Sequence, residues 1–290
     1  MSVNAPPPTP TGSASSRVWF ITGSSSGLGR AIAEQALAVG DTVVATARKV
    51  ESLAELTAIA PDRVTPLRLD VTSGIEIANA VQDAITWHGQ IDVLVNNAGH
   101  GFVGAAEETP DAELREMMDV HLHGPAALTR AVLPHMRARR TGAIVQMSSM
   151  SGQVSWPGLA AYSAAKFALE GYSESLAAEV EPFGIKVLIA EPGAFRTAFT
   201  GSALRFGTAI PDYDDVLDPV RKMLREVDGA QPGDPVKAAA AIQAALDSEH
   251  TPLRLALGAD AVDGIGERLD RVRAELEQWQ AVGRATAFAG

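Results

Sequence analysis

Residues 18–29 read VWFITGSSSGLG and join a short apolar run to a glycine-rich turn, after which a helical pattern begins. We expect the apolar run to be a buried strand. In the turn, Gly23 allows the tight bend, Gly27 lets the backbone approach a pyrophosphate, and Gly29 lets helix and strand pack closely. The amide groups at the start of the helix would then face an anion. The stretch favours a phosphate-binding turn, although such a turn taken alone can also be an ordinary loop.

Apolar runs and amphipathic stretches alternate along the rest of the chain. The expected strands are residues 18–21, 42–47, 64–69, 91–95, 143–147, 185–190 and 253–257. The expected helices are residues 28–39, 51–59, 75–87, 111–136, 160–180, 236–246 and 260–280, the fourth bent near Gly124-Pro125. This alternation predicts an α/β fold of the doubly wound, Rossmann type, with a seven-stranded, mostly parallel sheet and helices on both faces.

The length of 290 residues allows two domains, but one large α/β domain also fits. No linker interrupts the pattern after residue 17, so we expect one catalytic domain over residues 17–260. Residues 1–16 are rich in Pro, Ser, Thr and Gly and are expected to be a disordered tail. The proline-rich stretch 194–235 is expected to be a substrate lid. Residues 261–290 would form a helix and tail, the helix being either a packed surface helix or a dimer contact.

Composition excludes several classes of function. The 24 basic and 35 acidic residues give a net charge of -11, which argues against binding to nucleic acid. The absence of cysteine excludes disulfides, a thiolate nucleophile and cysteine-ligated metals, and no histidine pair has H-E-x-x-H spacing, so no metal site is expected. No apolar run approaches the length of a membrane span, and residues 1–16 lack the features of a signal peptide. We therefore expect no membrane partner and a cytoplasmic location.

Further motifs follow the glycine-rich turn in a fixed order. They are Asn96-Asn97-Ala98-Gly99, Ser149, Tyr162-Ser163-Ala164-Ala165-Lys166, and Pro192-Gly193 with Thr197. Together with T-G-x-x-x-G-x-G they resemble the short-chain dehydrogenase/reductase family over about residues 17–260. Within that family, Ala45–Arg48, Glu191–Thr197 and the C-terminal helix resemble the 17β-hydroxysteroid- and retinol-dehydrogenase-like branch.

The resemblance implies which residues hold a nicotinamide dinucleotide. They are Gly23, Ser25, Ser26, Gly27, Leu28, Gly29, Arg48, Asp70, Val71, Asn97, Ala98, Gly99, Tyr162, Lys166, Pro192, Gly193 and Thr197. In this set Asp70 matches the aspartate that contacts adenine in the family. Lys166 matches the lysine that also holds the hydroxyls of the nicotinamide ribose.

The end of the second expected strand bears on the choice of cofactor. Enzymes that prefer NAD place an acid there to bind the ribose 2′-hydroxyl. Here the chain reads Thr46-Ala47-Arg48-Lys49, without an acid, and the planar guanidinium of Arg48 suits a 2′-phosphate. The sequence predicts NADP(H) over NAD(H); the alternative is that Arg48 and Lys49 are merely solvated.

Three residues form the expected catalytic group. Tyr162 and Lys166 lie four apart on an expected helix and share a face, although this pair taken alone is more often a surface pair. A nearby ammonium favours the phenolate, so the pKa of Tyr162 should fall below its ordinary value of about 10 and suit proton exchange with a carbinol or carbonyl oxygen. Ser149 follows the fifth expected strand, and its hydroxyl can donate to the same oxygen. The neighbouring Ser148 is the alternative, but strand pleating and the family spacing favour Ser149.

His121 marks a departure from the family pattern. The family usually carries asparagine at the matching position, where it helps to hold a water that links the lysine to solvent. Histidine can also donate and accept hydrogen bonds, so it either keeps such a relay or merely fills the space. We hypothesise a working enzyme whose rate depends on the protonation of His121.

The expected activity is hydride transfer between NADP(H) and a hydrophobic secondary alcohol or ketone (or aldehyde), with Tyr162 as acid/base. An apolar pocket suits such a substrate. Its candidate lining is Phe195, Phe199, Leu204, Phe206, Tyr213, His100, Phe102, Val154, Trp156 and Leu159, although the aromatic residues could be ordinary packing. Two alternatives are a non-catalytic dinucleotide sensor and an epimerase or dehydratase. Epimerases and dehydratases of the related fold usually carry G-x-x-G-x-x-G in the first turn, which this chain lacks. Family members commonly pair through helices matching residues 110–136 and 160–180, so a homodimer is expected.

Overall fold

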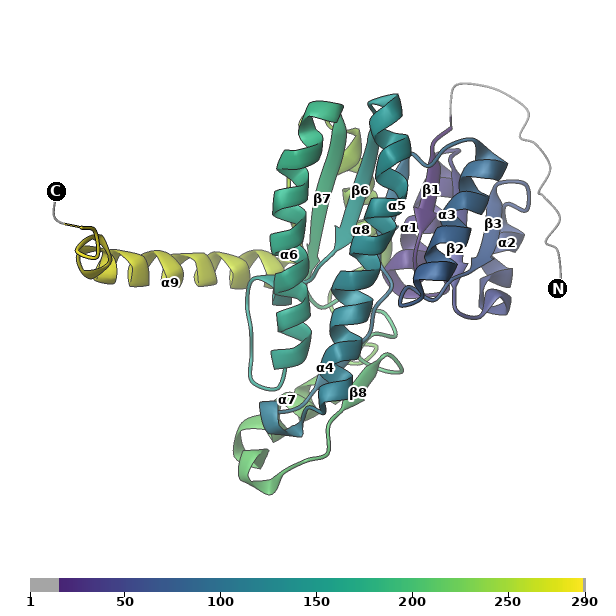
Figure 1. The fold of residues 1–290 in the computed structure, drawn as a ribbon. Helices are drawn as coiled ribbons and strands as arrows, with labels where there is room; N and C mark the ends of the chain where they lie inside the picture. Colours follow the sequence, from purple (N-terminus) through teal and green to yellow (C-terminus); the bar gives the residue numbers. More distant parts are fainter. Residues whose placement is uncertain (1–15, 289–290) are drawn as a thin grey trace.

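The computed structural model describes residues 16–288 and is organised around one seven-stranded sheet (Figure 1). The strands lie in the order β3-β2-β1-β4-β6-β7-β9, and every pairing is parallel. Their bounds are Val18–Ile21 (β1), Thr42–Ala47 (β2), Val64–Arg68 (β3), Val93–Asn96 (β4), Gly142–Met147 (β6), Ile185–Pro192 (β7) and Arg254–Leu257 (β9). The predicted fold class is confirmed. The strand order reverses between β1 and β4, which is where sheets of this kind bind ligands.

Helices cover both faces of the sheet. Their bounds are Gly27–Ala38 (α1), Ala54–Ile59 (α2), Gly74–His88 (α3), Asp111–Met118 (α4), Gly124–Arg139 (α5), Ala160–Val180 (α6), Asp214–Glu226 (α7), Pro235–Asp247 (α8) and Ala259–Arg284 (α9). The core on one face joins α1, α2 and α8, and the core on the other joins α3, α5 and α6. No helix within residues 16–288 combines the length and the apolarity needed to cross a membrane.

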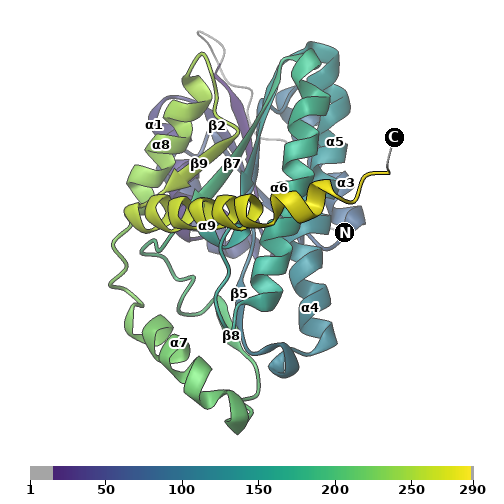
Figure 2. The ribbon, with the colours of Figure 1, turned by 90° about the vertical axis from the view of Figure 1, so that its left-hand side faces the viewer.

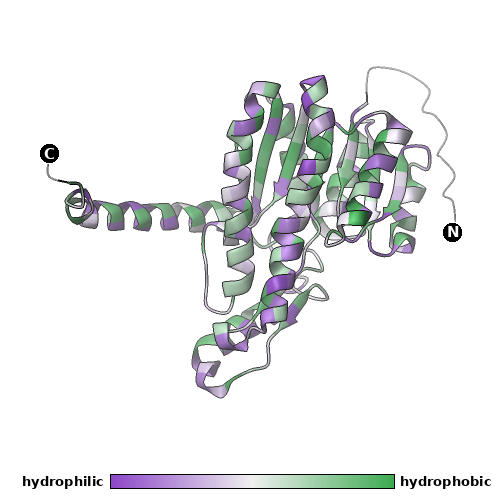
Figure 3. Cartoon of the chain, viewed as in Figure 1, coloured by the Kyte–Doolittle hydropathy of each residue, from purple (hydrophilic) through white to green (hydrophobic). Residues whose placement is uncertain are grey.

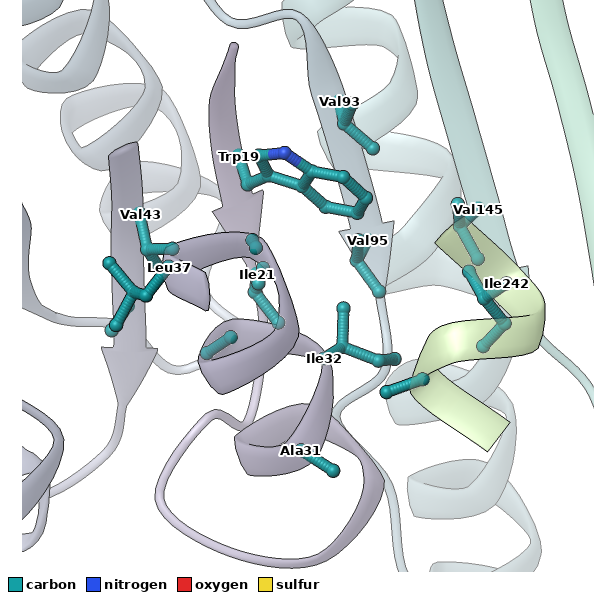
Figure 4. Packing of buried hydrophobic residues seen from close by; sticks show 14 of the residues in the cluster. Trp19, Ile21, Ala31, Ile32, Leu37, Val43, Val93, Val95, Val145 and Ile242 are labelled. Carbon is teal, nitrogen blue, oxygen red and sulfur yellow. The ribbon is translucent and has the colours of Figure 1, made fainter. Parts of the chain in front are cut away.

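Trp19 of β1 illustrates how the first core is built (Figure 4). Its side chain is 1% exposed and shares a cluster with Ile32 of α1 and Ile242 of α8. Its indole Nε1 donates to Asp41 Oδ2 at 2.8 Å, so the buried polar atom is satisfied. Figure 3 shows the strands as mainly hydrophobic, as expected where helices cover both faces.

Most expected elements match the structure to within one or two residues, and the strand over 42–47 and the helix over 160–180 match throughout. The stretch 111–136 differs. It consists of α4, a π-helical turn over Asp119–His123 and then α5. Pro125 follows this turn, within a helical run that begins at Asp111, and it has no N–H to donate to the preceding turn. The irregularity therefore precedes the proline and carries His121. The expected tail falls on residues 1–15, which lie outside the described residues.

The stretch 194–235 is more ordered than the sequence indicated. It contains α7 and the short strand β8 (Leu204–Phe206), which pairs in parallel with β5 (Gly101–Val103). This second, two-stranded sheet lies with α7 beyond one end of the main sheet (Figure 2). Strands of three residues are too short to show a period, and α7 was hidden by Pro219 inside it.

A buried ion pair fixes α7 to the rest of the molecule. Arg221 Nη2 of α7 lies 2.7 Å from both carboxylate oxygens of Glu108, and both residues are buried. The Glu108 carboxylate also accepts from the backbone N–H of Ala105 and of Ile210, at 2.9 and 2.8 Å. Burial acts to raise the pKa of Glu108, but Arg221 and these two amides outweigh it and the pKa is lowered.

Replacing Glu108 by Gln should loosen the 194–235 stretch. The substitution removes the buried carboxylate that pairs with Arg221 Nη2 and leaves the guanidinium only Asp214 and Asp218, which are more exposed and lie 3.2 and 3.1 Å from Nη1. Breaking a buried ion pair in this way costs up to about 3–5 kcal/mol. Hydrogen exchange should then show faster amide exchange within residues 194–235 and little change in β1 and β4. Glu107→Gln is the matched control, because Glu107 is exposed and accepts only from the Tyr213 hydroxyl. Equal protection of this stretch in Glu108→Gln and in the control would contradict the assigned role.

Candidate functional site

The residues predicted to hold the cofactor all follow the carboxyl ends of strands. Gly23, Ser25, Ser26, Gly27, Leu28 and Gly29 follow β1, Arg48 follows β2, Asp70 and Val71 follow β3, Asn97, Ala98 and Gly99 follow β4, and Pro192, Gly193 and Thr197 end or follow β7. Because parallel strands place these ends along one edge, residues from five separate parts of the chain meet there. Gly27 and Thr197 illustrate this, since a Cβ on Gly27 would lie 3.4 Å from Thr197 Cβ.

The turn after β1 has the backbone shape that the glycines were expected to allow. Gly23 has a φ of +67°, in the region that favours glycine. A Cβ on Gly29 would overlap the Asn97 side chain and the Gly23 carbonyl, so only glycine fits where α1 passes β4. Ser26 precedes α1 without a side-chain cap, and no acidic residue lies in the first turn. These features fit the phosphates of a dinucleotide.

Thr22 joins this turn to the loop after β4. Its Oγ1 accepts from the backbone N–H of Asn97 at 2.8 Å and of Ala98 at 2.9 Å. The Asn97 side-chain Nδ2 donates in return to Thr22 O at 2.9 Å. The Asn97 side chain thus holds two loops together, and its place in the motif has a structural reason.

Arg48 and Asp70 lie near each other at the edge. Arg48 is exposed, with no acid beside it in the chain. The Asp70 carboxylate accepts from the backbone N–H and hydroxyl of Thr72, and these bonds, with a smaller contribution from the charge of Arg48, lower the pKa of Asp70. This edge of the sheet therefore offers an anion-binding guanidinium at Arg48 and a hydrogen-bond acceptor at Asp70.

The four candidate catalytic residues also come together. Tyr162, Lys166, Ser149 and His121 are all buried. The Lys166 Nζ lies 5.6 Å from the centroid of the Tyr162 ring and donates to Met147 O at 2.7 Å. The His121 ring meets that of Tyr162 edge to face, with centroids 5.5 Å apart. Ser148, the alternative serine, instead donates to Glu170 Oε1 at 2.7 Å.

The electrostatics of Tyr162 differ from the sequence-based expectation. Burial raises its pKa to about 12, and a hydrogen bond with Ser149 offsets this only in part. Burial also lowers the pKa of Lys166 to about 7, opposed by the charge of Glu170. The expected lowering of the Tyr162 pKa is therefore wrong for this structure, because desolvation of the buried phenol outweighs the hydrogen bond with Ser149. The phenol is held in its protonated form.

His121 is neutral near physiological pH. Burial, and then the charge of Lys166, hold its pKa well below the ordinary value of 6.5. Its Nε2 lies 2.8 Å from His100 O, and its ring packs so closely on Gly99 that a Cβ there would lie 2.5 Å from His121 Cε1. These findings correct the hypothesis that protonation of His121 controls the rate. They leave open both the relay and the space-filling roles of the neutral ring.

Sequence reasoning missed a pair of buried acids, one of which, Glu170, accepts from the Ser148 hydroxyl. Glu170 and Glu191 are 4% and 2% exposed. Arg254 Nε lies 3.0 Å from Glu170 Oε2 and 3.6 Å from Glu191 Oε1. Burial and the neighbouring Glu170 raise the pKa of Glu191 to about 7. The sequence did contain one signal for Glu170: it follows Lys166 by one helical turn, so both side chains lie on the same face of the helix.

Of the expected pocket residues, some lie at Tyr162 and others do not. Phe102 packs with Tyr162, and the Phe199 ring lies 5.7 Å from it. Phe206 instead meets the Arg225 guanidinium, and Val154 packs against α9. The apolar wall beside the phenol is thus smaller than the sequence suggested.

Among the described residues, His100, Glu113 and Glu116 place possible metal-binding atoms within 4.8 Å of one another. Arg205 already pairs with Glu116 Oε2 at 2.8 Å and with Glu113 Oε2 at 3.4 Å. A guanidinium thus provides positive charge in this cluster. The absence of a metal site stays a prediction.

Comparison with known proteins shows the family. The sequence pattern of the short chain dehydrogenases matches residues 17–205. The chain is 39% identical to "Oxidoreductase BOA17" of Botryotinia fuckeliana (strain B05.10), over 93% of this chain and 99% of that protein. It is 36% identical to a "3-ketodihydrosphingosine reductase" of Bacteroides thetaiotaomicron, over 83% and 88%.

A solved structure agrees with these relatives. The crystal structure of a short-chain dehydrogenase from Streptomyces avermitilis superposes with a TM-score of 0.91 at 55% identity, covering 95% of this chain and all of that one. The chain therefore belongs to the short-chain dehydrogenase/reductase family and is an oxidoreductase that acts with NAD(P).

Proposed function

We propose that this enzyme interconverts a hydrophobic secondary alcohol and the corresponding ketone (or aldehyde) with NADP(H). The observation that carries the proposal is the position of the Tyr162 phenol, beside Ser149, Lys166 and Phe199, at the same edge of the sheet as the phosphate-binding turn. Residues 17–260 would form the catalytic domain, with residues 194–235 as the lid. We also propose a homo-oligomer paired through residues 110–136 and 160–180.

The protonation states favour carbonyl reduction. When bound, the nicotinamide supplies the hydride. Tyr162, protonated because its pKa is about 12, would donate its proton to the carbonyl oxygen as that oxygen gains charge. The Ser149 hydroxyl would donate a hydrogen bond to the same oxygen. Lys166, held by Met147 O, would stabilise the phenolate that remains.

Arg48 supports the choice of NADP(H). Its guanidinium is exposed at the end of β2, without the acid that would bind a ribose 2′-hydroxyl. A 2′-phosphate would pair with this guanidinium and would lie where the net charge of -11 is locally offset.

A hydrophobic ketone is the proposed substrate. Phe199 of the lid and Phe102 of β5 pack with Tyr162, and their side chains offer no hydrogen-bonding group. One relative is named 3-ketodihydrosphingosine reductase, which supports a keto group as the reacting group. Neither relative named above carries the name of a hydroxysteroid or retinol dehydrogenase. The resemblance to that branch therefore supplies test substrates and no more.

Replacing Tyr162 by Phe should lower kcat by roughly 10²–10⁴, the contribution typical of a general acid. The assay is the loss of NADPH absorbance with a panel of ketones, with NADPH binding measured separately. Tyr172→Phe is the matched control, since it removes a hydroxyl from the same helix away from the site. Tight NADPH binding with no turnover by wild type, and no change on substitution, would instead support the sensor.

Replacing Arg48 by Ala should lower the ratio of kcat/KM for NADPH to that for NADH by about 10–100-fold. The reason is the loss of a charged hydrogen bond, worth about 1.5–3 kcal/mol. Lys49→Ala is the parallel test of the other basic residue. A wild type that prefers NADH, or a ratio that Arg48→Ala leaves unchanged, would overturn the cofactor assignment.

The pH dependence of carbonyl reduction should follow Lys166 and not His121. The cationic form of Lys166 is lost as the pH rises through about 7, so kcat/KM should fall above that pH. His121→Asn should leave this inflection in place, because His121 is already neutral there. Lys166→Arg, which stays charged, should remove the inflection. A shift of the inflection in His121→Asn would show that the histidine does titrate.

A further inference from the structure

Helix α9 projects from the body of the molecule (Figures 1 and 2). Only its first turns are anchored, because Ala261 and Ile265 are the buried residues of its 26 and pack with Val154. From residue 269 to residue 284 every residue is exposed. Packing within the described part of this chain therefore does not account for the second half of the helix.

The exposed part continues an apolar stripe. Its members, spaced alternately by three and four residues, are Val262, Ile265, Leu269, Val272, Leu276 and Trp279. This is the a/d spacing of a coiled coil. Leu276 and Trp279 are 69% and 61% exposed, so a leucine and a tryptophan on one helix face lie in water. A face of this kind on a helix marks an interaction surface.

We propose that α9 binds α9 of a second copy of this chain, antiparallel and about a two-fold axis. In an antiparallel pair each a position faces a d position. Leu269 would then lie opposite the partner's Val272, and Trp279 opposite the partner's Val262, all four being exposed in this chain. The stripe is covered by an identical stripe, as an isologous contact requires.

Charge selects the antiparallel direction. Arg268 and Glu275 occupy consecutive g positions beside the seam, and neither forms an ion pair within residues 16–288. In the antiparallel register Arg268 faces the partner's Glu275, and the two-fold axis repeats this ion pair. In a parallel pair Arg268 would face the partner's Arg273, with like charges together.

The contact would also reach the lid. Asp260, in the first turn of α9, accepts through Oδ2 from the backbone N–H of Ala194 at 2.7 Å. This bond is made at the start of residues 194–235. Pairing of the helices would hold this first turn, and with it the root of the lid, between two copies.

The test is the mass in solution of the full chain, by light scattering over a range of concentrations. Wild type should be oligomeric at micromolar concentration. Arg268→Glu and Glu275→Arg should each raise the dissociation constant of this contact about tenfold or more, so that the mass halves where wild type stays assembled. The double variant should restore the wild-type mass, because it re-forms both ion pairs in reverse.

Two further variants make the test specific. Leu276→Asp should abolish the contact, whereas Arg271→Glu, the same charge reversal away from the seam, should leave the mass unchanged. Of the four substituted residues, Arg271, Glu275 and Leu276 are exposed and Arg268 is half-buried. Circular dichroism would check that the fold is intact. Stronger association in Arg268→Glu would indicate a parallel pair and overturn the proposal. So would a monomeric wild type, or an unchanged mass in Leu276→Asp.

Discussion

The hydroxyl of Thr22 holds together the two loops on which the site depends. It accepts two backbone amides from the loop after β4, while Asn97 returns a bond to the loop after β1. These are the loops on either side of the point where the strand order reverses. These bonds tie the turn at Gly23 to the loop from which the chain continues toward His121. The phosphate cradle and that loop therefore form one hydrogen-bonded unit.

Burial then sets the chemistry of the site. The same exclusion of water raises the pKa of Tyr162, lowers those of Lys166 and His121, and raises that of Glu191. Each shift disfavours the charged form, so the ligand-binding edge carries less charge than its residues suggest. For Glu191 the raised pKa means that the native state holds a proton that the unfolded chain releases. Its contribution to stability is thus lost as the pH rises from about 4.5 to about 7.

The parts of the fold that could be predicted are those in which a pattern of apolar residues extends over the whole element. Strand 42–47 and helix 160–180 were predicted throughout because their apolar pattern is long and uninterrupted. The three-residue strands β5 and β8 carry no such pattern, and they form only because the chain brings Gly101 beside Leu204. The site residues could be grouped by the family's motifs. Their pKa values could not, since these depend on burial by side chains such as Phe199, far away in sequence.

The close contact between His121 and Gly99 ties two positions that lie in different parts of the chain. While histidine occupies position 121, any side chain at position 99 would overlap its ring, so Gly99 is constrained by a neighbour as well as by its own loop. A smaller residue at 121 would release that constraint. We therefore expect a side chain at position 99 to be tolerated only together with a smaller residue at position 121.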